Sequence, residues 1–128
     1  MTMATFPESS PEARRKIRDL APETHSAVAA FGRQVFADGA LTAKTKQLIA
    51  VAVAHVTQCP YCIEGHTKAA RRAGSSPQEL MEAVWVAEEM RAGAAYAHAT
   101  LMISALPEEG GVSERASAPS TMREGIER

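Results

Sequence analysis

Pro60 divides a long helix-forming stretch of this chain into two parts. Residues 43–56 contain neither Gly nor Pro and are apolar all round in their second half, which favours a central, buried helix. Pro60 lacks a backbone N–H group and fits best at the first position of a new helix. The sequence therefore predicts two consecutive helices, interrupted near Gln58, the second of which runs from Pro60 to Arg72.

Upstream of this pair, apolar residues recur at helical spacing over residues 11–36, with a break at Ala21-Pro22. The pattern predicts a short helix, a turn and a second helix that Asp38-Gly39 ends. Apolar residues make up 45% of the chain but aromatic residues only 5%, which suits closely packed helices better than a sandwich of sheets. We therefore expect an all-α fold, a compact helical bundle.

Downstream of the pair, Ser76 is a suitable N-cap and Pro77 a suitable first residue for a helix that continues toward Met102. From Pro107 to Arg128, Gly, Pro, Ser and charged residues replace the apolar pattern. We therefore expect a single helical domain over residues 1–106 and a polar, mobile tail over residues 107–128.

The size and charge of the chain limit its partners. At 128 residues it can form one core, but a second subunit would help to bury its apolar faces, so we expect an oligomer. The 14 Lys and Arg residues nearly balance 15 Asp and Glu residues, which gives no electrostatic basis for binding nucleic acid or a membrane surface. Neither a leader segment nor an apolar run of about 18 residues is evident. We expect a cytoplasmic protein.

Both cysteines of the chain, Cys59 and Cys62, lie at the start of the second predicted helix, and His66 follows one turn later. The unpaired N–H groups of a helix N-terminus favour a thiolate there, and can lower the pKa of a cysteine from about 8.5 to about 7 or below. Because Cys62 and His66 share one helical face, the imidazole can take the thiol proton and return it to a leaving group. The cluster is suited to nucleophilic thiol chemistry.

Redox chemistry is the simplest interpretation of this cluster. In a reducing compartment, an isolated C-x-x-C pair is more often catalytic or metal-binding than a structural staple. Attack of the Cys62 thiolate on a hydroperoxide O–O bond would give a sulfenic acid, which Cys59 could resolve to a disulfide. An outside dithiol or reductase would then have to regenerate the thiols.

A zinc site built from His55, Cys59, Cys62 and His66 is the competing interpretation. On one continuous helix these residues would form a stripe about 16 Å long, whereas zinc needs a tetrahedron of ligands at about 2.0 to 2.3 Å. No second C-x-x-C pair supplies an opposing arm, so we expect no metal. A third possibility is a pair of inert, buried cysteines.

Other titratable residues carry weaker signals. His55 lies in an aliphatic segment, where it is either a core histidine or a participant in a proton relay. Glu88 and Glu89 interrupt the apolar pattern of the last helix, and one of them could face the site. We expect structural or surface positions for His25 and His98.

The cysteine motif is one of several segments, over about residues 40–105, that together resemble a known family. These segments are Lys44–Ala54, Cys59-Pro60-Tyr61-Cys62, His66–Ala70, Ala73-Gly74, Ser76–Glu79 and the helix with Ala83, Val84 and Ala87. Together these segments resemble the carboxymuconolactone decarboxylase-like superfamily, and within it the alkylhydroperoxidase D branch. The resemblance implies an all-helical bundle that assembles as a homotrimer or a homohexamer, with the cysteine pair near subunit contacts.

The resemblance also implies a thiol peroxidase cycle. By this likeness, Cys62 attacks the hydroperoxide substrate, Cys59 is the resolving partner and His66 handles the proton. No bound cofactor is expected, because in the family an external dithiol supplies the electrons, such as a lipoyl group on a partner protein.

Gln47 departs from the family pattern, which places a glutamate of the proton relay twelve residues before the first cysteine. A glutamine can hold a water or an imidazole by hydrogen bonds but cannot accept a proton as a carboxylate does. The relay would then run through water, through His55 or through a carboxylate such as Glu88, or else the peroxidase activity is low.

Two other functions remain open at this point. A thiol–disulfide redox sensor, or an oligomeric binding module that reports oxidation, would use the cysteine pair without turnover. Lactone decarboxylation, the reaction in the superfamily's name, is less favoured because that branch does not depend on a C-x-x-C pair. Consumption of peroxide over many turnovers would separate the enzyme from the sensor.

Overall fold

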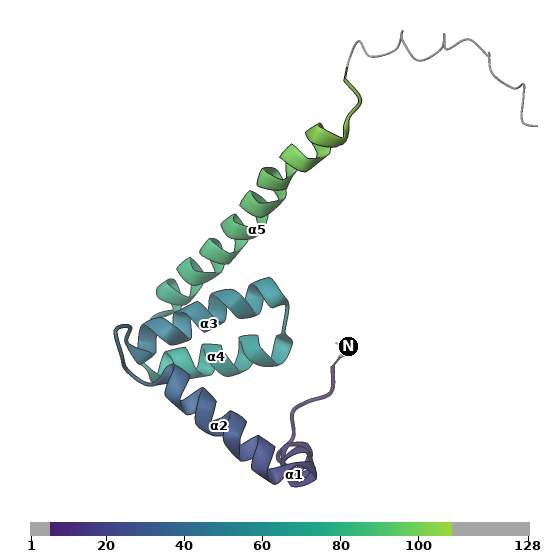
Figure 1. The fold of residues 1–128 in the computed structure, drawn as a ribbon. Coiled ribbons are helices and arrows are strands. Elements are labelled where there is room, and N and C mark those ends of the chain that lie inside the picture. The colour runs from purple at the N-terminus through teal and green to yellow at the C-terminus, as the bar shows by residue number, and fades with distance from the viewer. Residues whose placement is uncertain (1–5, 109–128) are drawn as a thin grey trace, which may run out of the picture. The chain divides into compact units, whose positions relative to one another are not determined.

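The computed structural model describes residues 6–108, and this part of the chain forms five α-helices without a β-strand. They are α1 (Pro11–Leu20), α2 (Pro22–Phe36), α3 (Ala43–Thr57), α4 (Pro60–Arg72) and α5 (Pro77–Ala105), as Figure 1 shows. The predicted all-α fold is therefore confirmed. Of the tail expected over residues 107–128, all but the first two residues lie outside the described part.

Backbone contacts divide the chain at Gly93 into two units. The first holds α1 to α4 and the beginning of α5, and the second holds the rest of α5. Helix α5 continues through Gly93 and ends at Ala105. The single domain expected over residues 1–106 stays a prediction.

Hydroxyl caps fix where three of the helices begin. The side chain of Ser10 accepts the N–H of Ala13 at 3.1 Å at the start of α1, and Thr42 accepts the N–H of Thr45 at 3.2 Å at the start of α3. At the start of α5, Ser76 Oγ accepts the N–H of Glu79 at 3.1 Å, while the Ser76 N–H donates to Glu79 Oε2 at 2.7 Å. These caps satisfy N–H groups that a helix start otherwise leaves unpaired.

The junction between α3 and α4 is a sharp turn, as the position of Pro60 predicts. Gln58 adopts left-handed backbone angles, φ 56° and ψ 43°, and ends α3. The N–H groups of Gln58 and Cys59 both donate to the carbonyl of Ala54, so this carbonyl in the last turn of the helix has hydrogen-bond partners. Helices α3 and α4 therefore run antiparallel and lie side by side (Figure 1).

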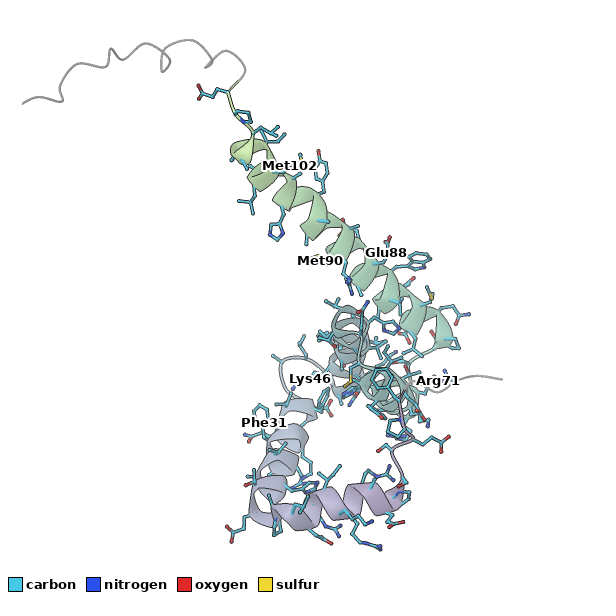
Figure 2. All side chains as sticks on the ribbon, turned by 90° about the vertical axis from the view of Figure 1, so that its right-hand side faces the viewer. Phe31, Lys46, Arg71, Glu88, Met90 and Met102 are labelled. Atoms are coloured by element: carbon cyan, nitrogen blue, oxygen red, sulfur yellow. A yellow bond between two sulfur atoms is a disulfide. The ribbon has the colours of Figure 1, made fainter. Side chains whose placement is uncertain are left out.

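The residues buried in the described part of the chain are mostly small. Val51 and Ala54 of α3, Ala70 of α4 and Ala87 of α5 are its buried apolar residues. Alanines let helix backbones approach closely, but they bury little apolar area. Larger apolar side chains are exposed, including Phe31 of α2 and Met90 of α5, which are labelled in Figure 2.

The first part of α5 is joined to α3 by two polar contacts. Lys44 forms an ion pair with Glu79 at 2.7 Å, and Arg91 Nη1 donates to the carbonyl of Val56 at 3.0 Å.

Within residues 6–108, no helix combines the length and the apolarity that crossing a membrane would require.

Candidate active site

The two cysteines lie at the start of α4 and are joined by a disulfide, with their Cα atoms 5.2 Å apart. Cys59 is the N-cap of the helix, and its sulfur accepts the backbone N–H of Cys62 at 3.2 Å. Pro60 between them begins the helix and needs no N–H partner. The turn that starts α4 therefore holds both sulfurs at its N-terminal end, where the helix dipole favours negative charge.

A cavity of about 410 Å³ opens beside this motif, between residues of α2, α3 and α4. Its volume falls in the range of about 300 to 1,000 Å³ that is usual for small-molecule sites. Cys62 is among the lining residues, and Cys59 is not. The lining residues are Val35, Phe36, Lys46, Ile49, Ala50, Val53, Ala54, Thr57, Cys62 and His66.

His66 is held in this cavity by two neighbours from other helices. Gln47 Oε1 of α3 accepts a hydrogen bond from His66 Nδ1 at 2.9 Å. The ring of Phe36, at the end of α2, lies 5.2 Å from the imidazole, centroid to centroid, with the two planes tilted by 30°. An amide oxygen only accepts, so Nδ1 carries the proton and Nε2 is left as the basic nitrogen.

Three of the other residues considered for a proton relay lie elsewhere. The Nδ1–H group of His55 donates to the carbonyl of Val51 at 2.7 Å, within α3, and His55 does not line the cavity. Glu88 and Glu89 are exposed and do not line it either. His25 and His98, for which structural or surface positions were expected, are exposed.

The carboxylate nearest to Cys62 in the sequence, Glu64, is exposed and bound to Lys68 one turn further along α4. The hydrogen bond and the charge of Lys68 hold the pKa of Glu64 below its ordinary value of 4.5. At neutral pH the Lys68 ammonium therefore offsets the charge of this carboxylate near the start of α4.

No group of three or more His, Cys, Asp and Glu side chains in the described part of the chain is arranged to hold a metal ion. The turn at Gln58 separates His55 from the other three residues of the zinc site considered above, Cys59, Cys62 and His66. His55 also forms a hydrogen bond within its own helix.

The sequence did not identify the residues of α2 that complete the site. Val35 and Phe36 were recognised as apolar positions of a helix, but their contact with His66 depends on how α2 meets α3 and α4. Lys46 was also missed. Its spacing from Ile49, Ala50 and Val53 could have identified it, because residues three, four and seven positions apart lie on one face of a helix.

Comparison with known proteins extends the resemblance upstream. Residues 22–105 match the carboxymuconolactone decarboxylase family, so the match begins before residue 40 and includes α2. "Uncharacterized protein 4 in cox locus" from Paracoccus denitrificans is 66% identical over 82 residues, which are 64% of this chain and 74% of that protein.

Two solved structures share the fold. A carboxymuconolactone decarboxylase family protein from Legionella pneumophila, in its apo form, is 34% identical with a TM-score of 0.59, over 62% of this chain and 70% of that chain. A structural genomics target from Methanobacterium thermoautotrophicum is 32% identical with a TM-score of 0.65, over 70% of this chain and 97% of that chain. The family match covers residues 22–105, which is more than half of this chain. The chain therefore belongs to the carboxymuconolactone decarboxylase family.

Proposed function

We propose that this protein is a thiol-dependent hydroperoxide reductase of the alkylhydroperoxidase D type. One observation carries the proposal: Cys62 and His66 line the same largely apolar cavity, while Cys59 is joined to Cys62 by a disulfide and does not line the cavity. This arrangement supports Cys62 as the cysteine that meets the substrate. It supports Cys59 as the cysteine that resolves the oxidised intermediate.

In the first step, the Cys62 thiolate attacks the distal oxygen of the hydroperoxide. The O–O bond breaks, a sulfenic acid forms on Cys62, and the alkoxide that leaves is protonated to an alcohol. His66 is the proposed source of that proton, after it has accepted the proton of the Cys62 thiol on Nε2. The hydrogen bond from Nδ1 to Gln47 supports this role, because it leaves Nε2 as the basic nitrogen.

In the second step, the Cys59 thiol attacks the sulfenic sulfur of Cys62. The S–S bond forms and water leaves, which gives the disulfide form of the chain. An external dithiol, proposed to be of the lipoyl type, then reduces the disulfide by thiol–disulfide exchange. One hydroperoxide and one dithiol are thereby converted to one alcohol, one water and one oxidised dithiol.

The same proposal includes a homotrimer or a homohexamer. Large apolar side chains are exposed along α2 and the first part of α5, among them Phe31, Trp85 and Met90. Exposed apolar area of this kind is usual at contacts between subunits.

The cytoplasmic location expected from the sequence also stays a prediction.

The test is peroxide-dependent oxidation of dihydrolipoamide by the reduced protein, with cumene hydroperoxide as the substrate. The proposal requires sustained turnover that is lost in Cys62→Ser. Cys59→Ser should still form a sulfenic acid on Cys62 but no disulfide within the chain. Turnover that survives in Cys62→Ser would refute the assignment of the attacking cysteine.

A redox sensor that does not turn over is the second candidate, and Gln47 is the observation that favours it. The residue that holds His66 cannot take up a proton, so regeneration of the base could be slow. A sensor would consume one equivalent of peroxide per disulfide formed and then stop in excess dihydrolipoamide. The turnover assay therefore separates the two functions.

A further inference from the structure

Lys46 brings a charged side chain to a cavity whose walls are mainly aliphatic and aromatic. The residue is half-buried, and its Nζ donates to the carbonyl of Ala37 at 2.6 Å. An ammonium group has three N–H donors, so this hydrogen bond leaves two of them. Among residues 6–108, Lys46 forms no ion pair with a carboxylate. The cavity therefore has a cationic group that can accept an anionic partner.

The antiparallel pairing of α3 and α4 fixes where Cys62 lies along the cavity. Gln47, next to Lys46, contacts His66, and at the other end Ala54 accepts the N–H of Cys59. Cys62 is therefore level with a part of α3 between these two contacts. The lining residues of α3 extend from Lys46 to Thr57, which is about 16 Å at 1.5 Å per residue.

An elongated molecule that follows this wall would have one end at Lys46, a middle part beside Cys62 and a remainder along apolar side chains. The apolar side chains beyond Lys46 on α3 are Ile49, Ala50, Val53 and Ala54. A neutral hydroperoxide would leave the Lys46 ammonium without an anionic partner. A carboxylate would form a charge-assisted hydrogen bond with it.

Resting on the hydroperoxide reductase function proposed above, we infer that the substrate is an aliphatic hydroperoxide with a carboxylate end, as in a fatty-acid hydroperoxide, and that Lys46 binds this carboxylate. The carboxylate takes no part in the reaction. The O–O bond is cleaved by Cys62, and the product that leaves the cavity is the corresponding hydroxy acid.

Lys46 also has a structural contact that the test must separate from substrate binding. Ala37 is the C-cap of α2, and a cation near the C-terminus of a helix stabilises it. Lys46→Gln keeps a donor for the Ala37 carbonyl but removes the charge. Lys46→Arg keeps the charge. Lys16→Gln is the matched control, because Lys16 is exposed on α1, where it pairs with Glu12.

The experiment compares binding of octanoate and 1-octanol to the disulfide form by calorimetry, in which neither thiol can react. We expect the wild-type protein to prefer octanoate. That preference should fall about tenfold in Lys46→Gln and persist in Lys46→Arg and Lys16→Gln. Equal binding of acid and alcohol by the wild type, an unchanged preference in Lys46→Gln, or no binding of either probe would overturn the inference.

A kinetic comparison distinguishes failure of this inference from failure of the proposed function. With linoleic acid hydroperoxide and its methyl ester, the ratio of the two kcat/KM values should favour the acid and fall about tenfold in Lys46→Gln, mainly through KM. Turnover without preference for the acid would refute the carboxylate site and leave the reductase. Charge-selective binding of octanoate without turnover of any hydroperoxide would refute the reductase and leave the carboxylate site.

Discussion

Gln47 of α3 and His66 of α4 form a hydrogen bond of 2.9 Å, from Nδ1 of the imidazole to the amide oxygen. The contact joins residues 19 positions apart: Gln47 directly follows Lys46, which lines the cavity, and His66 lies four residues after Cys62. A carboxylate at position 47 would accept the same hydrogen bond and would also stabilise the imidazolium by its charge. This difference makes position 47 the most informative place for a substitution.

Gln47→Glu should raise the turnover number of peroxide reduction, on the order of tenfold, because the new carboxylate can take part in proton transfer. Steady-state oxidation of dihydrolipoamide measures the effect. Gln34→Glu introduces the same charge at an exposed position of α2 and should leave the rate unchanged. An equal or lower rate in Gln47→Glu, in a protein with unchanged helicity, would contradict the prediction.

His66→Gln should lower kcat/KM for a hydroperoxide by roughly 100-fold, since it removes the proposed base beside Cys62. The measurement is the second-order rate of Cys62 oxidation, which does not depend on the reductant. His25→Gln makes the same change at an exposed site and should react like the wild type. If both variants react alike, His66 has no role in the chemical step.

Glu79 makes stability depend on pH. Its hydrogen bond with Lys44, together with the N–H of Ser76 and the charge of Lys44, holds the pKa of Glu79 below its ordinary value of 4.5. A carboxylate whose pKa is lowered by folding stabilises the fold above 4.5, and this contribution is lost as the pH falls through the lowered pKa.

Glu79→Gln should therefore lower the Tm at pH 7, and the difference from the wild type should shrink as the pH falls below 4.5. Thermal unfolding at several pH values measures this. Glu82→Gln, at an exposed position of the same helix, is the control. A Tm difference for Glu79→Gln that stays constant down to pH 3 would show that charge is not its cause.

The turn between α4 and α5 contains a residue that should tolerate loss of its side-chain oxygen. Ser75 is fully buried, and its hydroxyl has no hydrogen-bond partner in the described part of the chain. Burying an unpaired hydroxyl costs free energy, so Ser75→Ala should raise the free energy of unfolding by up to about 1 kcal/mol. Chemical denaturation measures the change, and a loss of stability would mean that the hydroxyl has a partner.

A substitution at the neighbouring Gly74 should have the opposite effect on the free energy of unfolding. Its φ of +96° is unfavourable for residues with a side chain, although the space around it would admit a Cβ atom. Gly74→Ala should therefore lower the free energy of unfolding by about 1 to 2 kcal/mol through backbone strain alone. The same denaturation series tests it, and equal stability of Gly74→Ala and the wild type would contradict it.

The local structure was predictable because it follows from local chemistry. Pro60 predicted the turn between α3 and α4, and Ser76 with Pro77 predicted the start of α5, since caps and proline act within a few residues. The association of Cys59, Cys62 and His66 was predictable for the same reason. Their spacing places them on the first turns of one helix.

The rest of the site depends on contacts between helices, which the sequence alone did not reveal. Phe36 had the spacing of an apolar helix position, but nothing in that spacing placed its ring against His66. Gln47 was singled out by the family pattern, and its hydrogen bond with His66 became evident only from the packing of α3 on α4. His55, in contrast, was considered for the relay, but it donates a hydrogen bond to a carbonyl of its own helix.

The most direct test of the account is to locate the sulfenic acid. Cys59→Ser would be treated with one equivalent of cumene hydroperoxide in the presence of dimedone, and the modified residue identified by mass spectrometry. The account predicts a dimedone adduct on Cys62, and slower formation of that adduct in the His66→Gln background. The absence of an adduct on Cys62, under conditions in which the wild type consumes peroxide, would contradict the central claim.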